Sequence, residues 1–269
     1  MSEENILDRI VAYKKDEVEL QKKNLPINII KEGLESVSPP LSIEKKFQEA
    51  IVRGKIALIG EVKKASPSKG LIRKDFNPVD IAILYQESGA SAISVLTDEH
   101  FFQGSLDYLR DVTSVVNIPV LRKDFIIDPY QIYQSRYYGA DLILLISSIL
   151  SKLQILEYQE IASSLGMSSL IETHSQEDFD YFLEKEIRFI GINNRDLNTF
   201  DTDINHTLML VKNKHLCKSF IISESGINCF EHIAKLSNAG ISGVLIGEYF
   251  MRQDNISLSI NKMFKGSQS

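Results

Sequence analysis

Cysteine and histidine, the residues that most often hold metals, are scarce in this chain. Its 269 residues include two cysteines, Cys217 and Cys229, and five scattered histidines. The cysteines lack a metal-type spacing, no His-Glu-x-x-His pair occurs, and no disulfide framework is implied. A Walker loop and a Gly-x-Gly-x-x-Gly fingerprint are also missing. The residues therefore suggest neither a metal site nor a nucleotide site.

Excess positive charge and long hydrophobic runs are lacking as well. The net charge is −6 and the isoelectric point is about 5.5, which argues against a general nucleic-acid binder. The N-terminus has no basic region followed by an apolar one, so no signal peptide is visible. The longest apolar run, residues 140–150, is interrupted by Asp141 and two serines and is too short to span a bilayer. We expect a cytoplasmic protein that binds neither nucleic acid nor membrane.

Short β-rich runs recur from residue 56 onward, at intervals of roughly 20–35 residues, the length of one βα unit. The runs are Ile56–Lys63, Ser91–Thr97, Pro119–Phe125, Asp141–Ser147, Ser168–Thr173, Arg188–Asn193, Phe220–Glu224 and Gly243–Gly247. Helical patterns lie between them, and several of these end on glycine. Eight such units predict a closed (β/α)₈ TIM barrel, an α/β fold. We expect one domain over residues 1–269, with the barrel in residues 56–253.

The first 50 residues predict a helical extension of this barrel. Residues 5–23 are strongly helical, and Ile6, Ile10, Val11 and Val18 are spaced along one face. A second helix is expected over residues 41–51, after Pro39-Pro40, with Ser42 as its cap. The apolar stripe of the first helix needs a cover, so we expect that helix to pack across the catalytic mouth of the barrel.

Polar side chains gather where the predicted strands end, which is where barrels of this kind place their active sites. Glu61 and Lys63 are two residues apart and therefore face the same side of their strand. The other strand ends supply Lys123, Phe125, Glu172, Asn193, Arg195, Ser225, Gly226 and Gly247. An isolated charge at a strand end is usually solvated, and we interpret Arg122 and His174 as such rim residues. Several strand ends that converge with lysines, glutamates and an asparagine instead predict a site suited to proton transfer.

A phosphate group is the expected anchor of the substrate. Gly226 and Gly247 follow the seventh and eighth strands, where barrels commonly bind phosphate on loop amides and on the N-terminus of a short helix. Ser66 and Arg195 would add a hydroxyl and a positive charge. The two glycines alone would indicate no more than tight turns.

Five motifs of the chain resemble those of indole-3-glycerol phosphate synthase, in the right order from the first helix to the last strand. They begin at Glu61 (EVKKASPSKG), Leu96 (LTDEHFFQG), Leu121 (LRKDFI), Ile192 (INNRDL) and Ser223 (SESGI). The resemblance implies a cofactor-free (β/α)₈ lyase of tryptophan biosynthesis that uses no metal. Such an enzyme converts 1-(2-carboxyphenylamino)-1-deoxyribulose 5-phosphate to indole-3-glycerol phosphate, carbon dioxide and water. Its partner would be this small phosphorylated substrate, and we expect a monomer.

The resemblance also implies a role for each residue of the site. Lys123 would be the general acid at the substrate carbonyl, and Glu172 the base or proton shuttle of the dehydration. Glu61 and Lys63 would complete the charged site, with Lys63 near the substrate carboxylate. The remaining residues would bind: Asn193 and Ser225 would orient the substrate, Pro67, Phe102, Phe125 and Leu197 would pack on its anilino ring, and Ser66, Arg195, Gly226, Gly247 and the amide of Glu248 would hold its phosphate. Some relatives carry serine where this chain has Glu248, and a carboxylate there cannot help to bind an anion.

Two alternatives stay open at the level of sequence. Phosphoribosylanthranilate isomerase is another phosphate-binding barrel, but it would be expected to use a cysteine–aspartate pair, and neither cysteine lies at a predicted strand end. A barrel that binds a phosphorylated ligand without catalysis is the second alternative, and the intact Lys63, Lys123 and Glu172 argue against it.

Overall fold

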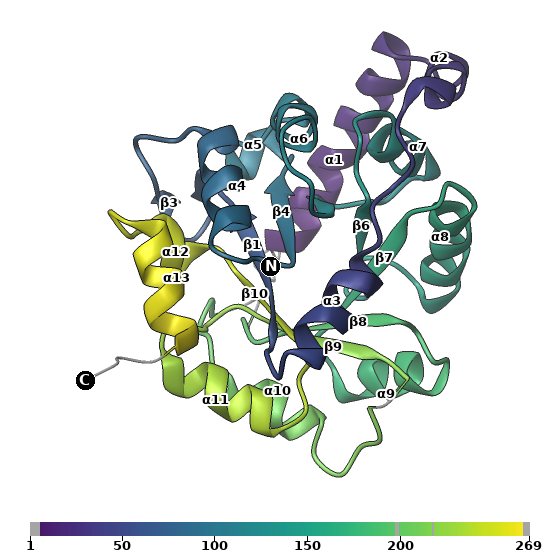
Figure 1. The fold of residues 1–269 in the computed structure, drawn as a ribbon. Coiled ribbons are helices and arrows are strands. Elements are labelled where there is room, and N and C mark those ends of the chain that lie inside the picture. The colour runs from purple at the N-terminus through teal and green to yellow at the C-terminus, as the bar shows by residue number, and fades with distance from the viewer. Residues whose placement is uncertain (1–5, 197–198, 217, 266–269) are drawn as a thin grey trace.

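The computed structural model describes residues 6–196, 199–216 and 218–265. Its centre is a closed barrel of parallel strands in the order β1-β10-β9-β8-β7-β6-β5-β4, so each strand pairs with its neighbour in sequence along the barrel and β10 closes onto β1 (Figure 1). The barrel strands are β1 (Ala57–Val62), β4 (Ala92–Leu96), β5 (Val120–Lys123), β6 (Leu142–Ile146), β7 (Ser168–Thr173), β8 (Phe189–Asn193), β9 (Phe220–Glu224) and β10 (Gly243–Ile246). These are the runs that the sequence predicts, and the predicted (β/α)₈ barrel is confirmed. A short hairpin of β2 (Ala65–Ser66) and β3 (Gly70–Leu71) follows β1.

Helices surround the barrel and follow its strands (Figure 1). They are α4 (Pro78–Glu87), α5 (Glu99–Phe102), α6 (Leu106–Thr113), α7 (Pro129–Tyr137), α8 (Lys152–Ser164), α9 (Gln176–Glu184), α10 (Asn205–Leu210), α11 (Phe230–Asn238), α12 (Glu248–Met251) and α13 (Ile256–Lys265). The N-terminal extension forms α1 (Ile6–Asn24), α2 (Ile27–Gly33), a 3₁₀ turn η1 (Leu34–Ser36) and α3 (Ile43–Val52). Local sequence explains several helix starts: Ser42 caps α3 as predicted, and Asn77 caps α4 with Pro78 in the first turn. Among the described residues, no helix has the length and the apolar composition needed to cross a bilayer.

Strand alternation divides the core into two layers. On β1, Ala57 and Ile59 pack in the barrel interior, whereas Leu58 and Val62 belong to the layer between strands and helices. Gly60 shares that outer face, and a Cβ atom there would lie 2.4 Å from the ring of Tyr85 on α4. The same alternation carries Glu61 into the barrel, at the carboxyl end of its strand.

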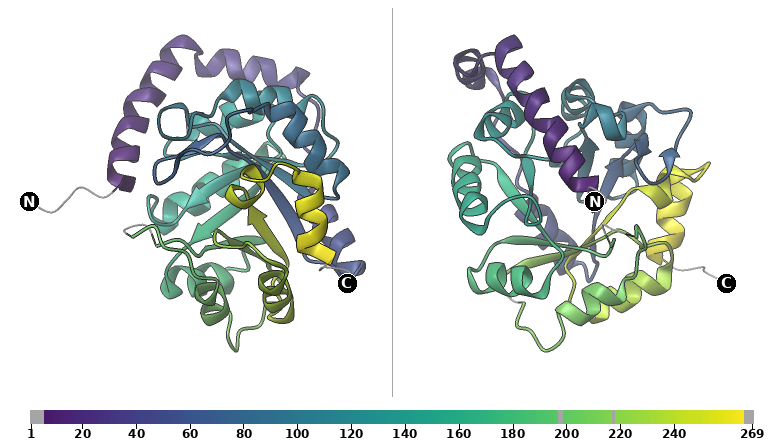
Figure 2. Two further views of the ribbon diagram at one scale, coloured as in Figure 1. Left: turned by 90° about the vertical axis from the view of Figure 1, so that its left-hand side faces the viewer. Right: turned by 180° about the vertical axis from the view of Figure 1, so that it is seen from behind.

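Two helices of the extension cover opposite ends of the barrel. Phe47 of α3 packs edge-on against Phe189 and Phe220, at the amino ends of β8 and β9. On the other side, α1 crosses the mouth at the carboxyl ends of the strands, as the view from behind shows (Figure 2). Ile6 and Ile10 line the cavity in that mouth. The predicted position of the first helix is thus confirmed, and a charged residue, Lys14, is buried on the same face.

Candidate active site

A buried ion pair stands at the end of β1. The Nζ atom of Lys63 lies 2.6 Å from Oε2 of Glu61, and both side chains are largely shielded from solvent. The pairing follows from local geometry, because positions i and i+2 of a strand share a face. The carboxylate of Glu61 also needs Gly247 beside it, since a Cβ atom at Gly247 would lie 2.2 Å from Oε2 of Glu61. Gly247 therefore makes room for Glu61 as well as lying in the predicted phosphate loop.

Lys123, the last residue of β5, stands between two glutamates from other strands. Its Nζ atom lies 2.7 Å from Oε2 of Glu172 at the end of β7 and 3.4 Å from Oε2 of Glu224 at the end of β9. The amide of Asn193 donates to Oε1 of Glu172 at 3.0 Å, and its own oxygen accepts from the backbone of Arg195. Asn193 thus holds Glu172 in the orientation that faces Lys123.

Burial and neighbouring charge set the protonation of this group. Burial alone would lower the pKa of Lys123, but the negative charge of its acidic neighbours, Glu172 foremost, outweighs burial and raises that pKa, so the ammonium is retained at neutral pH. Burial alone would raise the pKa of Glu172, but Lys123 and the hydrogen bond from Asn193 lower it. Glu172 is therefore a carboxylate at neutral pH.

Glu224 differs in protonation from Glu172, the other glutamate in contact with Lys123. Burial raises its pKa to about 8; Lys123 opposes this shift, and the negative charges of Glu172 and Glu61 add to it. The cluster of Glu61, Lys63, Lys123, Glu172 and Glu224 holds three carboxyl groups and two amino groups, so one proton on Glu224 balances its charge. Glu224 is the one member that we did not identify from the sequence. The available signal was strand alternation, which puts Glu224 on the same inward face as Ile222.

An apolar wall faces these charges. The rings of Phe102 and Phe125 lie 6.0 Å apart at a tilt of 38°. Pro67 from the turn between β2 and β3 lines the same cavity, as do Ile6 and Ile10 from α1. The site therefore offers a flat aromatic group a hydrophobic surface beside the lysines.

The loops after β8, β9 and β10 form a polar end of the cavity. Ser225 and Gly226 adopt left-handed backbone conformations, with φ of 68° and 75°. The hydroxyl of Ser66 is buried and has no hydrogen-bond partner among the described residues. Arg195 donates to the carbonyl of Phe200 and lies 3.4 Å from the carboxylate of Glu248. That carboxylate also pairs with Arg252, at 3.0 Å.

One cavity of about 750 Å³ brings together the site residues predicted from the sequence. It is lined by Glu61, Lys63, Lys123, Glu172, Asn193, Ser225, Ser66, Pro67, Phe102, Phe125, Arg195, Gly226, Gly247 and Glu248. Leu197, the remaining predicted residue, lies outside the described residues. Within the described part of the chain, no group of three His, Cys, Asp or Glu side chains is arranged to hold a metal ion.

The interpretation of Arg122 as a solvated rim residue is wrong. Its side chain is 1% exposed and points away from the barrel interior toward α7. There it donates to the carbonyl of Gln131, to Gln134 and to Asp124. Strand alternation explains the difference, because Arg122 faces opposite to Leu121 and Lys123. His174 is half-buried at the end of β7, within 3.0 Å of the carbonyl of Asn193.

Known proteins that are similar to this chain indicate its family. The family model described as indole-3-glycerol phosphate synthase matches residues 7–263. Curated proteins of that name are similar over nearly the whole chain. The one from Alkaliphilus metalliredigens is 45% identical, covering 97% of this chain and 98% of that protein. The one from Prochlorococcus marinus (strain MIT 9215) is 48% identical, covering 97% and 89%.

Solved structures of more distant proteins share the barrel. A 3-hexulose-6-phosphate synthase matches with a TM-score of 0.63 at 11% identity, covering 77% of this chain and 98% of that one. A mutant tryptophan synthase alpha-subunit from Pyrococcus furiosus matches with a TM-score of 0.59 at 14% identity, covering 77% and 97%. At such identities the likeness shows the fold alone. The family match and the curated relatives show more: this chain belongs to the indole-3-glycerol phosphate synthase family.

Proposed function

We propose that this protein converts 1-(2-carboxyphenylamino)-1-deoxyribulose 5-phosphate to indole-3-glycerol phosphate, carbon dioxide and water. The observation that carries the proposal is the position of Lys123, a retained ammonium between Glu172 and Glu224, beside the Glu61–Lys63 pair and opposite an aromatic wall. Family membership supports the same reaction. The expected cytoplasmic location, monomeric state and single-domain organisation stay predictions.

Ring closure needs a proton donor at the ketone. The ring carbon that bears the carboxylate attacks the carbonyl carbon, and the carbonyl oxygen takes a proton to become a hydroxyl. We assign that proton to Lys123, because the acidic groups around it keep it charged despite its burial. Glu61 and Glu172, which face the lysines, keep the ammonium groups oriented toward the substrate.

Decarboxylation then restores the aromatic system of the ring. The carbon–carboxylate bond breaks, carbon dioxide leaves, and the bonding pair returns to the ring. Lys63, paired with Glu61 in the cavity that Phe102 and Phe125 also line, is suited to orient the substrate carboxylate until it is lost. The apolar surface of Phe102 and Phe125 favours the neutral product over the anion.

Dehydration completes the indole. The hydroxyl made in ring closure leaves as water after it gains a proton, and a base takes a proton from the ring system. Glu172 is the carboxylate available as the base, and the protonated Glu224 is a suitable donor to the leaving hydroxyl. Two glutamates with pKa values moved in opposite directions thus divide the acid and base roles.

The phosphate would lie at the polar end of the cavity. Gly226, Gly247, Glu248, Ser66 and Arg195 all line the cavity, and we assign the phosphate to the backbone amides of the first three, the hydroxyl of Ser66 and the guanidinium of Arg195. Glycine at 226 supports the left-handed conformation of the loop. Ser225 and Asn193 line the same cavity, where they would orient the ribulose chain.

Turnover of the arylamino-ribulose phosphate, followed by indole fluorescence, tests the proposal. We expect formation of indole-3-glycerol phosphate without added metal or cofactor. Isomerisation of phosphoribosylanthranilate instead, or binding without turnover, would favour one of the two alternatives. Cys229, a residue of the loop before α11, does not line the cavity, so a cysteine-based isomerase is disfavoured.

A further inference from the structure

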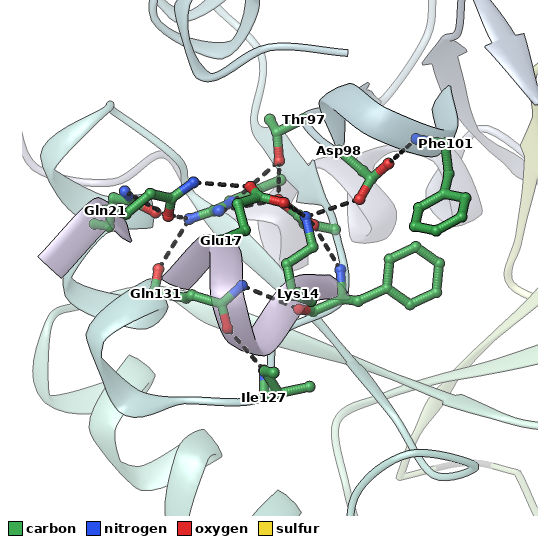
Figure 3. Close-up of polar contacts among 12 residues, drawn as sticks. Lys14, Glu17, Gln21, Thr97, Asp98, Phe101, Ile127 and Gln131 are labelled. Carbon is green, nitrogen blue, oxygen red and sulfur yellow. Dashed lines mark hydrogen bonds and ion pairs between the residues drawn. The ribbon is translucent and has the colours of Figure 1, made fainter. Parts of the chain in front are cut away.

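Helix α1 buries a lysine on the face that it turns toward the barrel. The side chain of Lys14 is 1% exposed, and its Nζ atom lies 2.8 Å from Asp98, 3.0 Å from Asp124 and 2.9 Å from Glu17 (Figure 3). Lysine is rarely buried to this degree unless it is paired. This lysine lies one turn beyond Ile10, which lines the catalytic cavity.

The two aspartates belong to the carboxyl ends of neighbouring barrel strands. Asp98 follows β4 and caps α5, where its Oδ1 atom accepts from the amide of Phe101 at 2.7 Å. Asp124 directly follows Lys123 and accepts from the hydroxyl of Thr97 at 2.6 Å and from Arg122 at 2.9 Å. We call Lys14, Glu17, Asp98, Asp124 and Arg122 the Lys14 cluster. It ties α1 to the rim on which the catalytic residues stand.

The members of the Lys14 cluster stabilise one another in their charged forms. Burial alone would lower the pKa of Lys14, but Asp124, Asp98 and Glu17 raise it. Burial alone would raise the pKa of Asp124, but Lys14 and Arg122 lower it. Removing one partner of a buried pair is costly because it leaves a buried charge without compensation. Among the described residues Asp98 pairs with no cation but Lys14, so loss of Lys14 would make the docked position of α1 unfavourable.

A second ion pair on the same helix provides a comparison. Lys22 of α1 lies 2.8 Å from Asp128, the cap of α7, but both side chains are about one-third exposed. Exposed pairs of this kind contribute little to stability. Lys22 also pairs with Glu19, so it contacts two carboxylates where Lys14 contacts three, at similar distances, and the two lysines differ mainly in burial.

We propose that Lys14 is a positioning residue that holds α1 docked over the catalytic mouth without touching the substrate. The proposal rests on the proposed function, because the docked helix supplies Ile6, Leu7 and Ile10 to the substrate cavity. If only the docked form binds substrate well, the apparent KM rises in inverse proportion to the docked fraction. Saturating substrate then restores docking, so kcat is preserved.

Lys123 is held independently of α1. Its carbonyl accepts from the amide of Thr97 at 3.1 Å, and β4 and β5 pair in register at Leu96 and Lys123. Thr97 and Arg122 also keep Asp124 in place when Lys14 is absent. For this reason a loss of Lys14 is expected to act on binding rather than on the chemical steps.

A fluorescent reporter tests docking without reference to activity. The chain has no tryptophan. Tyr13 of α1 stacks on His100 of α5 with ring centroids 4.1 Å apart, and it does not line the cavity. In a Tyr13→Trp protein, adding Lys14→Met should shift the emission to longer wavelength and increase quenching by acrylamide. Adding Lys22→Met, the matched control, should leave both unchanged. Unchanged emission and quenching after Lys14→Met would overturn the proposal.

Steady-state kinetics supply the second test. Lys14→Met should raise KM at least tenfold and leave kcat within threefold, whereas Lys22→Met should change neither. Asp98→Asn keeps a capping side chain for α5 and removes one buried charge. In the Asp98→Asn background, the factor by which Lys14→Met raises KM should be at least threefold smaller than it is in the unmodified protein. This difference is the coupling expected within one cluster.

The outcomes separate the possible roles of Lys14. A lower melting temperature with unchanged KM would mean a merely structural role and would contradict the proposal. A loss of kcat in parallel with KM would place Lys14 in the chemistry and contradict it as well. If the unmodified protein does not turn over the arylamino-ribulose phosphate, the proposed function fails, and the tryptophan reporter still decides whether Lys14 docks α1.

Discussion

The carboxyl group of Glu224 occupies the space beside Gly191, where a Cβ atom would lie 2.1 Å from Oε1. Gly191 on β8 is thus the reason that a third glutamate fits among Lys123, Glu61 and Glu172. A methyl group at this position would push the carboxyl group away from Lys123. The geometry of the proposed proton donor therefore depends on a residue with no side chain.

Gly191→Ala tests this relationship. We expect kcat to fall on the order of tenfold or more, because Glu224 moves out of reach of the leaving hydroxyl. In a Glu224→Ala background the same substitution should have little further effect, since the group that it displaces is gone. Equal losses in both backgrounds, measured by indole formation, would show that Gly191 acts through another contact.

Lys123→Met should lower kcat by a factor on the order of 10²–10⁴, because the proton donor for ring closure is removed. KM should change much less, since the phosphate and the aromatic ring keep their contacts. Lys55→Met, at an exposed lysine before β1, serves as the control for loss of one positive charge. A Lys123→Met protein with more than a tenth of the original kcat would rule out the assignment.

Glu172→Gln keeps the shape of the side chain and removes the base. We expect dehydration to fail while binding of the substrate persists, with release of carbon dioxide continuing in a single turnover. Rapid-quench analysis would reveal the intermediate that has lost carbon dioxide and still carries the hydroxyl group. Unchanged turnover would move the base to another carboxylate of the site, with Glu61 the nearest candidate.

The raised pKa of Glu224 predicts a dependence on pH. Activity that needs its proton should decline as the pH rises through about 8, and Glu224→Gln, which is always neutral, should alter this alkaline limb. The contribution of Glu224 to the free energy of unfolding also falls as the pH rises. The folded protein keeps a proton that the unfolded chain releases above its ordinary pKa of 4.5, so this contribution is complete below that pH and is lost as the pH rises toward about 8.

Melting temperatures at two pH values measure this linkage. Relative to the unmodified protein, Glu224→Gln should gain stability between pH 5 and pH 9, because glutamine has no charged form to destabilise the buried site. A difference in melting temperature that is the same at both values would contradict the raised pKa.

Glu248→Ser should strengthen binding of inorganic phosphate. The carboxylate of Glu248 engages Arg195 and Arg252 at the phosphate end of the cavity, so its removal frees two guanidinium groups. A partly exposed charge is worth about 1 kcal/mol, which corresponds to roughly a fivefold lower inhibition constant for phosphate. Glu231→Ser, on the exposed start of α11, is the control. Weaker inhibition in Glu248→Ser would mean that the side chain helps to position the arginines.

Local pattern was sufficient for the barrel and for much of the site. The strands could be predicted because parallel strands covered on both faces read as short apolar runs, and the glycines after helices mark their ends. The Glu61–Lys63 pair follows from the two-residue period of a strand, which needs no knowledge of the rest of the chain. The convergence of Lys123, Glu172 and Asn193 follows from barrel closure, since all carboxyl ends of the strands meet at one mouth.

Long-range contacts decided the remaining features. The sequence shows an apolar stripe on α1, but Lys14 is buried within it. Its partners Asp98 and Asp124 follow two neighbouring strands that are far from α1 in the sequence. Arg122 is buried because α7 covers the outer face of β5 with polar partners. The pKa of Glu224 depends on its burial and on three charges that barrel closure brings around it. Periodicity determines which way a side chain points; the tertiary structure alone determines what it meets there, and so whether an ionisable group is solvated, paired or kept neutral by a bound proton.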